Sequence, residues 1–353
     1  MDRIHQDVSR KIRENSRQYA SAVIDRQWTQ YPELARRYDS LGREKCLDDT
    51  VFHLNYLADA LEVDEMDLFL EYLKWVKVLF SHLHIPAEDM VKNLEVMENV
   101  FRDELPGESF SLLQRFLSGG REEYPGLPET IPSFITGDNP HASVAQSYLD
   151  AVLDGSRVEA REIILQAVEE GVSVREVYLN VFQPVLREIG RLWQIREVSV
   201  AQEHHATAIT QSILAVLYEQ NFSWQSGEQS LVAVSVAEEL HEMGIRMVAD
   251  FFAMEGWRTY YLGANSPVRD VVQLLAEKEI PLLCISSTLT SHLNRMIALI
   301  TAVRQESRCE SVRILVGGYP FTLAPHLWEK IGADGTATDA VRAVETAERL
   351  LQE

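Results

Sequence analysis

The spacing of apolar residues separates the chain into three regions. Through residues 1–120, apolar residues recur every three or four positions. The repeat is clearest in segment 51–83, where it runs through Leu54, Leu57, Leu61, Leu68, Tyr72, Trp75, Val76 and Leu79. Residues with this spacing share one face of a helix, so residues 1–120 are predicted to form a helical domain. Residues 121–141 lose the repeat and contain four prolines, which predicts a linker.

Residues 142–224 return to the helical repeat in four consecutive segments. These segments are residues 143–155, 156–171, 173–198 and 199–221. Ser156, Ser173 and Ser199 begin three of them, and each is followed three residues later by Glu or Gln, as in a capping box. Helices of this length joined by short loops predict a compact, antiparallel four-helix bundle.

Residues 229–353 follow a different pattern, in which continuous apolar runs alternate with amphipathic helical stretches. The runs are residues 230–237, 257–263, 281–288 and 312–318. This alternation is typical of a parallel sheet with helices on both faces. The predicted fold class is therefore α + α/β multidomain, ending in a flavodoxin-like, doubly wound parallel sheet. Such sheets bind ligands beyond the carboxyl ends of their strands, so the loops after the first, third and fourth runs are the candidate sites.

Composition argues against two classes of function. The 353 residues carry a formal net charge of −21, whereas a nucleic-acid-binding face must be basic, so direct nucleic-acid binding is not expected. No stretch approaches the roughly 20 apolar residues that span a membrane, and the charged N-terminus lacks the apolar core of a secretory signal. Three scattered cysteines fit a reducing compartment, so we predict a cytoplasmic protein.

The loop after the first apolar run carries the strongest candidate for chemistry. His241 follows the strand, Glu239 stands two residues before it, and Gly244 lets the chain turn into the next helix. A carboxylate that accepts a hydrogen bond from one ring nitrogen fixes the tautomer of a metal-binding imidazole and increases its basicity. His241 is therefore a candidate metal ligand, with Glu239 orienting it.

Three motifs in order resemble those of cobalamin-binding domains. That family has an acid-x-His-x-x-Gly motif after the first strand, Ser-x-Leu after the third and Gly-Gly after the fourth. This chain has Glu239, His241 and Gly244, then Ser287 and Leu289, then Gly317 and Gly318. The resemblance implies that His241 is the lower axial ligand of cobalt and that the later residues line a slot for the nucleotide tail. The acid is Glu239, where many corrinoid enzymes have Asp, so the geometry about His241 should differ from theirs.

A second motif, in the predicted bundle, resembles the light-sensing CarH-type cobalamin proteins. Trp193 is followed, after nine residues, by Glu203 and His204, and Val200 lies between them. The resemblance implies that Trp193, Val200 and Glu203 enclose the upper ligand, and that His204 takes the upper axial position after light breaks the cobalt–carbon bond. The neighbouring His205 is an alternative for that role.

The N-terminal region differs from the helix-turn-helix domain of CarH-type regulators, because it is acidic and rich in aromatic residues. Its place in the chain resembles the architecture of photocobilins, which also bind a bilin, so biliverdin is a candidate second cofactor. Candidate contacts are His53, Tyr56, Tyr72, Trp75, His82 and His84, with Arg36 or Arg37 for the propionates and Cys46 as the only N-terminal thiol. Each of these aromatic residues would equally suit a helical core.

Three functions follow from these resemblances. The leading prediction is a cobalamin-dependent photoreceptor, using adenosylcobalamin, that signals through altered domain or subunit packing to a protein partner and is not an enzyme. The alternative is a corrinoid methyl carrier of a methyltransferase system. The third is a cobalamin-responsive scaffold whose N-terminal helices only bind a partner. Assembly into a homo-oligomer is expected from the light-sensing relatives.

Overall fold

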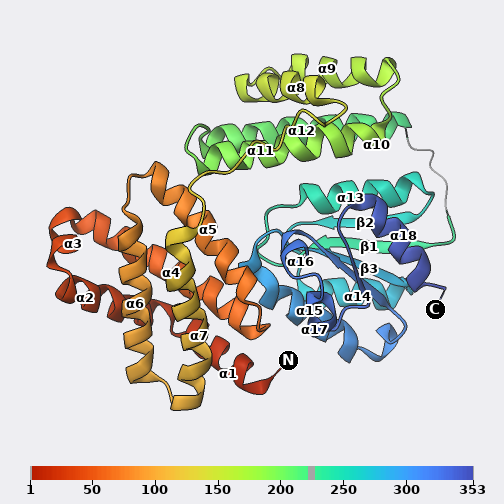
Figure 1. Ribbon diagram of the computed structural model, residues 1–353. Helices are drawn as coiled ribbons and strands as arrows, with labels where there is room; N and C mark the ends of the chain where they lie inside the picture. Colours follow the sequence, from red (N-terminus) through yellow and green to blue (C-terminus); the bar gives the residue numbers. More distant parts are fainter. Residues whose placement is uncertain (1, 222–226, 353) are drawn as a thin grey trace.

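A computed structural model describes residues 2–221 and 227–352, which form three parts (Figure 1). The first part is helical, as the apolar spacing predicts. Its helices are α1 (Arg3–Glu14), α2 (Ser16–Gln30), α3 (Pro32–Arg37), α4 (Ser40–Glu62), α5 (Met66–His82), α6 (Ala87–Glu104) and α7 (Gly107–Glu123), followed by the short η1 (Tyr124–Gly126). Buried Leu, Phe and Val side chains from these helices form its core.

The middle part has helix in each of the four predicted segments. It consists of α8 (Ala142–Asp154), α9 (Arg157–Glu169), α10 (Val174–Glu176), the π-helical η2 (Val177–Phe182), α11 (Gln183–Gln194) and α12 (Val200–Asn221). Ser173 and Ser199 form the predicted capping boxes, whereas the hydroxyl of Ser156 donates to Asp154 instead of capping α9. The predicted end of the bundle, 222–224, lies outside the described residues.

The C-terminal part is a parallel sheet of five strands in the order β2-β1-β3-β4-β5, the flavodoxin-like order. The strands are β1 (Ser230–Ser235), β2 (Arg258–Gly263), β3 (Leu282–Ser286), β4 (Arg313–Gly317) and β5 (Gly335–Ala337), of which β5 is not predicted by the sequence pattern. The other elements are α13 (Met243–Met254), α14 (Val268–Lys278), η3 (Thr290–His292), α15 (Leu293–Gln305), η4 (Ser307–Cys309), α16 (Tyr319–Leu323), α17 (Leu327–Ile331) and α18 (Ala340–Leu350). The strand order reverses between β1 and β3, so their carboxyl ends border the expected ligand crevice.

The two faces of the sheet belong to two different cores. Along β1, Val232 and Val234 pack into a core that continues through α14, α15 and the N-terminal helices. Leu231 and Ala233 point the other way, into a core shared with α13, α18 and the middle helices. This alternation follows from the two-residue period of a strand. Helices α14 and α15 cover one face of the sheet and α13 and α18 cover the other, and the N-terminal and middle helices each join the core on one of these two sides.

Polar contacts tie the N-terminal part to the sheet domain. The ammonium group of Lys330 in α17 donates to the carbonyl of Val63 at 3.2 Å and lies 2.5 Å from the carboxylate of Glu65. The hydroxyl of Tyr319 in α16 donates to Glu71 of α5 at 2.5 Å. The Tyr319 contact brings α5 beside the carboxyl end of β4, and the packing of α4 on η3 brings α4 beside the carboxyl end of β3. Among the described helices, none combines the length and apolar character needed to cross a membrane.

Candidate functional site

Glu239 and His241 form the predicted pair in the loop after β1. Glu239 is fully buried, and its Oε1 lies 2.5 Å from Nδ1 of His241 and accepts a hydrogen bond from the His241 backbone N–H at 3.0 Å. The imidazole remains 57% exposed. With Nδ1 donating to the carboxylate, Nε2 is the ring nitrogen left for a metal.

The second carboxylate oxygen of Glu239 joins this loop to the one after β3. Oε2 accepts from the backbone N–H groups of Thr288 and Leu289 at 2.8 and 3.0 Å, and Nδ1 of His292 lies 3.3 Å away. Burial by itself raises the pKa of Glu239, but hydrogen bonds from His241 and His292 bring that pKa well below its usual range. The carboxylate is therefore an anion held by two adjacent strand ends.

The glycine pair after β4 lies against the loop after β3. Gly318 has φ of 107°, and a Cβ there would stand 1.9 Å from the carbonyl oxygen of Ser287. Gly317 leaves more room, since its Cβ would meet only the Ala337 carbonyl at 3.4 Å. The hydroxyl of Ser287 donates to the Leu289 carbonyl at 3.0 Å. Close approach of two loops thus requires glycine at 318, whatever the slot holds. Gly244 lies in the first turn of α13, where a Cβ would meet nothing within 4 Å.

The upper-ligand residues come from the middle part. Trp193 ends α11 with 39% exposure, and Val200 begins α12 with 52% exposure. The Glu203 carboxylate lies 2.5 Å from Nδ1 of His204, whose side chain is 72% exposed. His205 faces a different element, because its imidazole lies 3.5 Å from where a Cβ of Gly155, just after α8, would stand.

One face of helix α12 is turned toward the loop after β1. The amide of Gln211 donates to Glu242 at 3.0 Å, and Glu242 is the residue after His241. Glu203 lies about two turns earlier on the same face of α12. The hydrogen bond to Glu239 raises the pKa of His241, and the negative charge of Glu203 adds to that rise. Glu203 and His241 are therefore close enough to interact across the space between the two parts.

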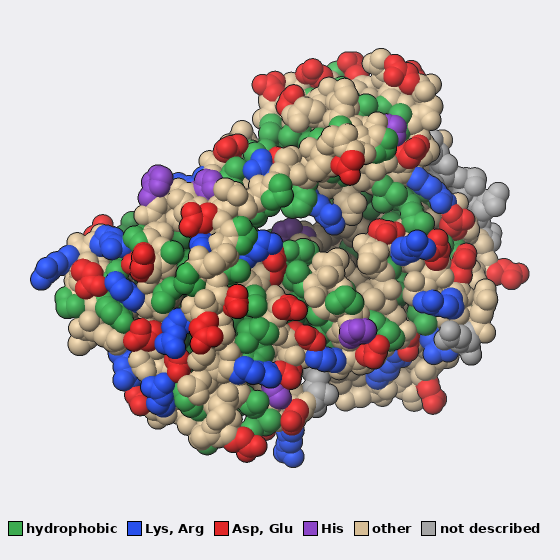
Figure 2. Space-filling view, in the orientation of Figure 1, with side chains coloured by type: hydrophobic (Ala, Val, Ile, Leu, Met, Phe, Trp, Pro, Cys, Tyr) green, Lys and Arg blue, Asp and Glu red, His purple; other side chains and the backbone are tan. Residues whose placement is uncertain are grey.

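Three further residues border this space and were not predicted from the sequence. Leu240 is 76% exposed beside His241, and Tyr319, directly after Gly318, is 44% exposed. Arg187 of α11 interacts electrostatically with Tyr319. Figure 2 shows a hollow where the three parts of the molecule meet, with Lys and Arg side chains at its border. Exposed apolar side chains grouped at a hollow are typical of a ligand-binding surface.

The structure distributes the candidate bilin contacts over separate places. His53 bonds the Tyr72 hydroxyl at 2.6 Å, Tyr56 stacks on Tyr72, and Trp75 lies 6.2 Å from the Trp193 ring, so these four pack between α4, α5 and α11. The His82 ring is hydrogen-bonded to the Val78 carbonyl, and Arg37 forms an ion pair with Asp89, whereas Arg36 is exposed. Burial raises the pKa of the Cys46 thiol to about 11.

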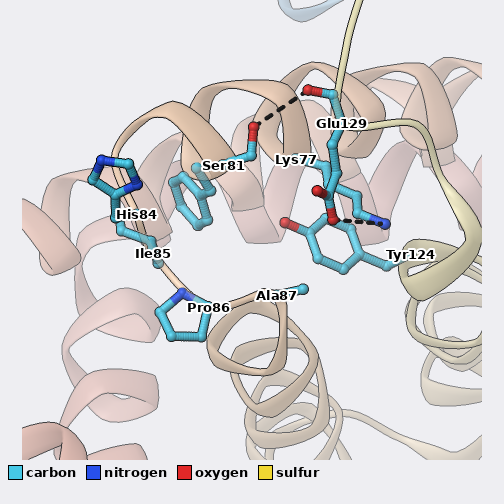
Figure 3. Close-up of a pocket in the computed structure, with 9 residues that line it drawn as sticks. Lys77, Ser81, His84, Ile85, Pro86, Ala87, Tyr124 and Glu129 are labelled. Carbon is cyan, nitrogen blue, oxygen red and sulfur yellow. Dashed lines mark hydrogen bonds and ion pairs between the residues drawn. The ribbon is translucent and has the colours of Figure 1, made fainter.

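His84 instead lines a cavity of about 280 Å³ (Figure 3). Lys77, Ser81 and Tyr124 line it too, and Glu129 closes one side through contacts with Lys77 and Ser81. The volume lies at the lower end of the range for sites that bind small organic molecules. Neither Glu239 nor His241 lines this cavity, and His84 is the single predicted bilin contact among its lining residues.

A corrinoid matches the donor set at the hollow. Among the residues that the structure describes, no three His, Cys, Asp or Glu side chains gather as a protein-only metal site requires. A corrin ring brings its own equatorial nitrogens, so one oriented imidazole is enough from below. His241 could provide that imidazole, and Leu240 beside it would add exposed apolar surface for the ring.

Comparisons with known proteins agree with this donor set. Residues 229–345 match a family described as B12 binding domain, and residues 144–218 match a second family of the same description. The dimethylamine corrinoid protein of Methanosarcina barkeri is 30% identical over 122 residues, which are 34% of this chain and 56% of that protein. The chain thus spans about half the length of that relative.

Two other relatives cover more of the chain. A corrinoid protein of Desulfitobacterium hafniense is 23% identical over 59% of this chain and 98% of its own length. The solved monomethylamine corrinoid protein of Methanosarcina barkeri has a TM-score of 0.53 at 20% identity and covers 60% of this chain and 99% of that one, which supports a common fold. The chain therefore contains two segments similar to B12 binding domains, which supports corrinoid binding. Its relatives named here are methylamine and other corrinoid proteins, and both family matches lie beyond residue 143.

Proposed function

We propose that this chain holds a cobalamin between the loop after β1 and helix α12, and that it acts as a cobalamin-dependent light sensor. The observation that carries the proposal is the 2.5 Å contact between buried Glu239 and Nδ1 of His241, directly across from the Glu203 end of α12. When bound, the corrinoid supplies a cobalt–carbon bond that light can break. The chain supplies the lower ligand, the cover and the replacement ligand.

Each residue has a defined task in this proposal. Glu239 holds the His241 ring so that Nε2 points toward the metal. Trp193 and Val200 present apolar surface that excludes water from the upper face. Glu203 keeps the His204 ring beside it through the Nδ1 contact, which would leave the other ring nitrogen of His204 available as a replacement ligand.

The contacts of Trp193 support a signalling role. Its ring meets Trp75 of α5 at 6.2 Å, and the neighbouring Gln194 donates its side-chain amide to the Trp75 carbonyl at 2.9 Å. A change in the upper ligand that displaces Trp193 therefore acts directly on the N-terminal part. Local ligand changes of this kind bias the packing of domains that have two arrangements. We propose a protein partner and a change of assembly as the output.

The second candidate is a corrinoid methyl carrier, and the comparisons favour it over the light sensor. The relatives by name are dimethylamine and monomethylamine corrinoid proteins, and in this role the protein partner is a methyltransferase. A carrier has to open the upper face of its cofactor to that partner. Here Trp193 is in contact with the N-terminal part of the chain itself, so a carrier function requires that part to move away.

One experiment separates the two functions. The full chain is loaded with adenosylcobalamin in the dark, and its absorption spectrum and mass in solution are recorded before and after green light. The sensor predicts a lasting spectral change that depends on His204, with His205→Ala as matched control. If light changes neither quantity, and protein loaded instead with hydroxocobalamin and chemically reduced to cob(I)alamin accepts a methyl group from a methylamine through a methylamine methyltransferase, with release of the demethylated amine, the carrier is the correct function.

A bilin in the N-terminal part remains a separate proposal. The aromatic group of His53, Tyr56, Tyr72 and Trp75 lies beside the hollow and is the best-supported place for it. Expression with biliverdin tests this directly, because a far-red absorption band would accompany binding. A preparation without that band, at full cobalamin occupancy, would exclude the second chromophore.

A further inference from the structure

Glu239 is shared by two imidazoles, and only one of them belongs to the cobalamin motif. The second is His292, which ends η3, has a side chain 17% exposed and lies with Nδ1 3.3 Å from Glu239 Oε2. The motif residues account for the other contacts of this oxygen, through the N–H groups of Thr288 and Leu289. His292 therefore adds a side-chain donor to the group that holds His241.

The short helix that carries His292 lies against the N-terminal part. Helix α4 packs on η3, and the Tyr56 hydroxyl is within hydrogen-bonding reach of the Ser291 side chain, one residue before His292. On its other side the Tyr56 ring stacks on Tyr72, with ring centroids 3.8 Å apart. Tyr72 in turn is bonded to buried His53 at 2.6 Å. An unbroken series of contacts thus runs from the interior of the N-terminal part to the Glu239 carboxylate.

We propose that His292 is a positioning residue for His241, and that the N-terminal part sets the orientation of His241 through α4, Ser291, His292 and Glu239. The proposal rests on the proposed function only in taking His241 as the lower ligand. It requires no light, and it applies to a sensor and to a carrier alike. It gives the N-terminal part a role at the lower face of the cofactor, in addition to the Trp75–Trp193 contact at the upper face.

The physical reason is the geometry of a carboxylate. Donors on Oε2 decide the rotation of the Glu239 side chain, and that rotation decides where Oε1 stands relative to His241. Two backbone donors remain without His292, so the carboxylate stays in place but turns more freely. We expect corrinoid affinity to fall roughly three- to tenfold, less than the 10- to 100-fold typical of a direct partner of a metal ligand.

Four variants of the full chain test this series of contacts from α4 to Glu239. His292→Phe keeps a ring but removes the donor, whereas His292→Asn keeps an amide N–H near the position of Nδ1. Tyr56→Phe keeps the stack on Tyr72 and removes the hydroxyl that reaches Ser291. Lys330→Met is the matched control, because it removes another contact between the same two parts without touching η3.

The first readout needs no corrinoid. In protein labelled with ¹⁵N-histidine, the ring nitrogen shifts report the tautomer and the hydrogen bond of His241, with His241→Ala to assign the signal. We expect His292→Phe and Tyr56→Phe to shift the His241 Nδ1 signal in the same direction, and His292→Asn and Lys330→Met to leave it at the wild-type position. An unchanged signal in His292→Phe, or an equal shift in Lys330→Met, would overturn the proposal.

The second readout uses hydroxocobalamin. Affinity is measured by spectral titration. Electron paramagnetic resonance of ¹⁵N-histidine-labelled protein measures the coupling of a histidine nitrogen to the reduced cobalt, which is a doublet, whereas the unlabelled base of the cofactor gives a triplet. His292→Phe and Tyr56→Phe should each weaken binding, and the double variant should weaken it by less than the product of the two, because both act through Glu239. If the ¹⁵N-histidine coupling survives in His241→Ala, the proposed lower ligand fails, while the nitrogen shifts of the apo protein still decide the positioning role.

Discussion

The two sides of the proposed corrinoid site are built in different ways. Below the cofactor, His241 is held by a carboxylate with no exposure, which takes hydrogen bonds from two neighbouring strand ends. Above it, Trp193 and Val200 are 39% and 52% exposed, and the His204 side chain is 72% exposed. The lower side is part of the sheet domain, whereas the upper side comes from a separate set of helices.

This difference indicates which side can change. A group held by several buried hydrogen bonds keeps one arrangement, because each broken bond leaves a buried polar atom without a partner. Exposed side chains at the end of a helix carry no such cost and can rearrange when their neighbour changes. We therefore expect cofactor binding to depend on the lower side and the response to depend on the upper side.

The largest effect should come from removing the lower ligand. His241→Ala should weaken hydroxocobalamin binding by more than 100-fold, about 3 kcal/mol, and abolish the coupling of a ¹⁵N-labelled histidine nitrogen to the reduced cobalt. His204→Ala should leave binding in the dark unchanged and destabilise only the illuminated product. Spectral titration in the dark measures both affinities. A His204→Ala variant with a binding loss as large as that of His241→Ala would reverse the comparison.

The next effect concerns the glycine pair behind the lower side. Gly318→Ala should destabilise the protein by about 2–3 kcal/mol, because φ of 107° suits only glycine and the new Cβ would meet the Ser287 carbonyl. Gly317→Ala is the matched control, since its Cβ would find its nearest neighbour at 3.4 Å. Urea unfolding followed by circular dichroism measures both free energies. Equal losses would mean that the tight approach of the two loops is unimportant.

Much of the lower side could be predicted from the sequence, because its geometry follows from the fold. In a flavodoxin-like sheet the first and third strands are neighbours with their carboxyl ends together, so the Glu239–His241 pair and Ser287 were expected to lie close to one another. The hydrogen bond between Glu239 and His241 agrees with that expectation. The cap predicted at Ser156 was wrong, because the Ser156 hydroxyl donates to Asp154 instead. The spacing of residues along the sequence does not show which of two nearby acceptors a hydroxyl will use.

The features that could not be predicted from the sequence depend mostly on contacts between parts of the chain that are far apart in sequence. His292, Tyr319 and Arg187 belong to no motif, and their positions follow from how three separately folded regions pack. The strand β5 is only three residues long, which is too short for an apolar run to predict. The roles assigned to Trp193, Val200, Glu203 and His204 remain predictions, although the structure does bring α12 opposite His241.

The third prediction concerns the stability of the N-terminal part at low pH. Burial lowers the pKa of His53 from 6.5 to about 3, so between these values the unfolded chain binds a proton that the folded chain does not. Stability from this group is therefore complete above pH 6.5 and is lost as the pH falls, by about 2 kcal/mol at pH 5. His53→Gln should remove that part of the acid sensitivity, measured by unfolding at pH 7 and pH 5. The same pH dependence in both proteins would assign it to other groups.

The smallest effect compares one carboxylate from each side on the same imidazole. Glu239 bonds His241 directly, whereas Glu203 acts on it only through its charge, and both raise the pKa of His241. Glu239→Gln and Glu203→Gln should therefore both lower that pKa in the apo protein, the first by clearly more than the second. Titration of the His241 ring signals in ¹⁵N-histidine-labelled protein measures the two changes.

Added salt should reduce the effect of Glu203→Gln more than that of Glu239→Gln, because the partly exposed Glu203 carboxylate is screened by salt while a buried hydrogen bond is not. If the two substitutions proved equal and equally sensitive to salt, Glu239 would be acting as a distant charge, and the separation between a rigid lower side and a changeable upper side would no longer hold.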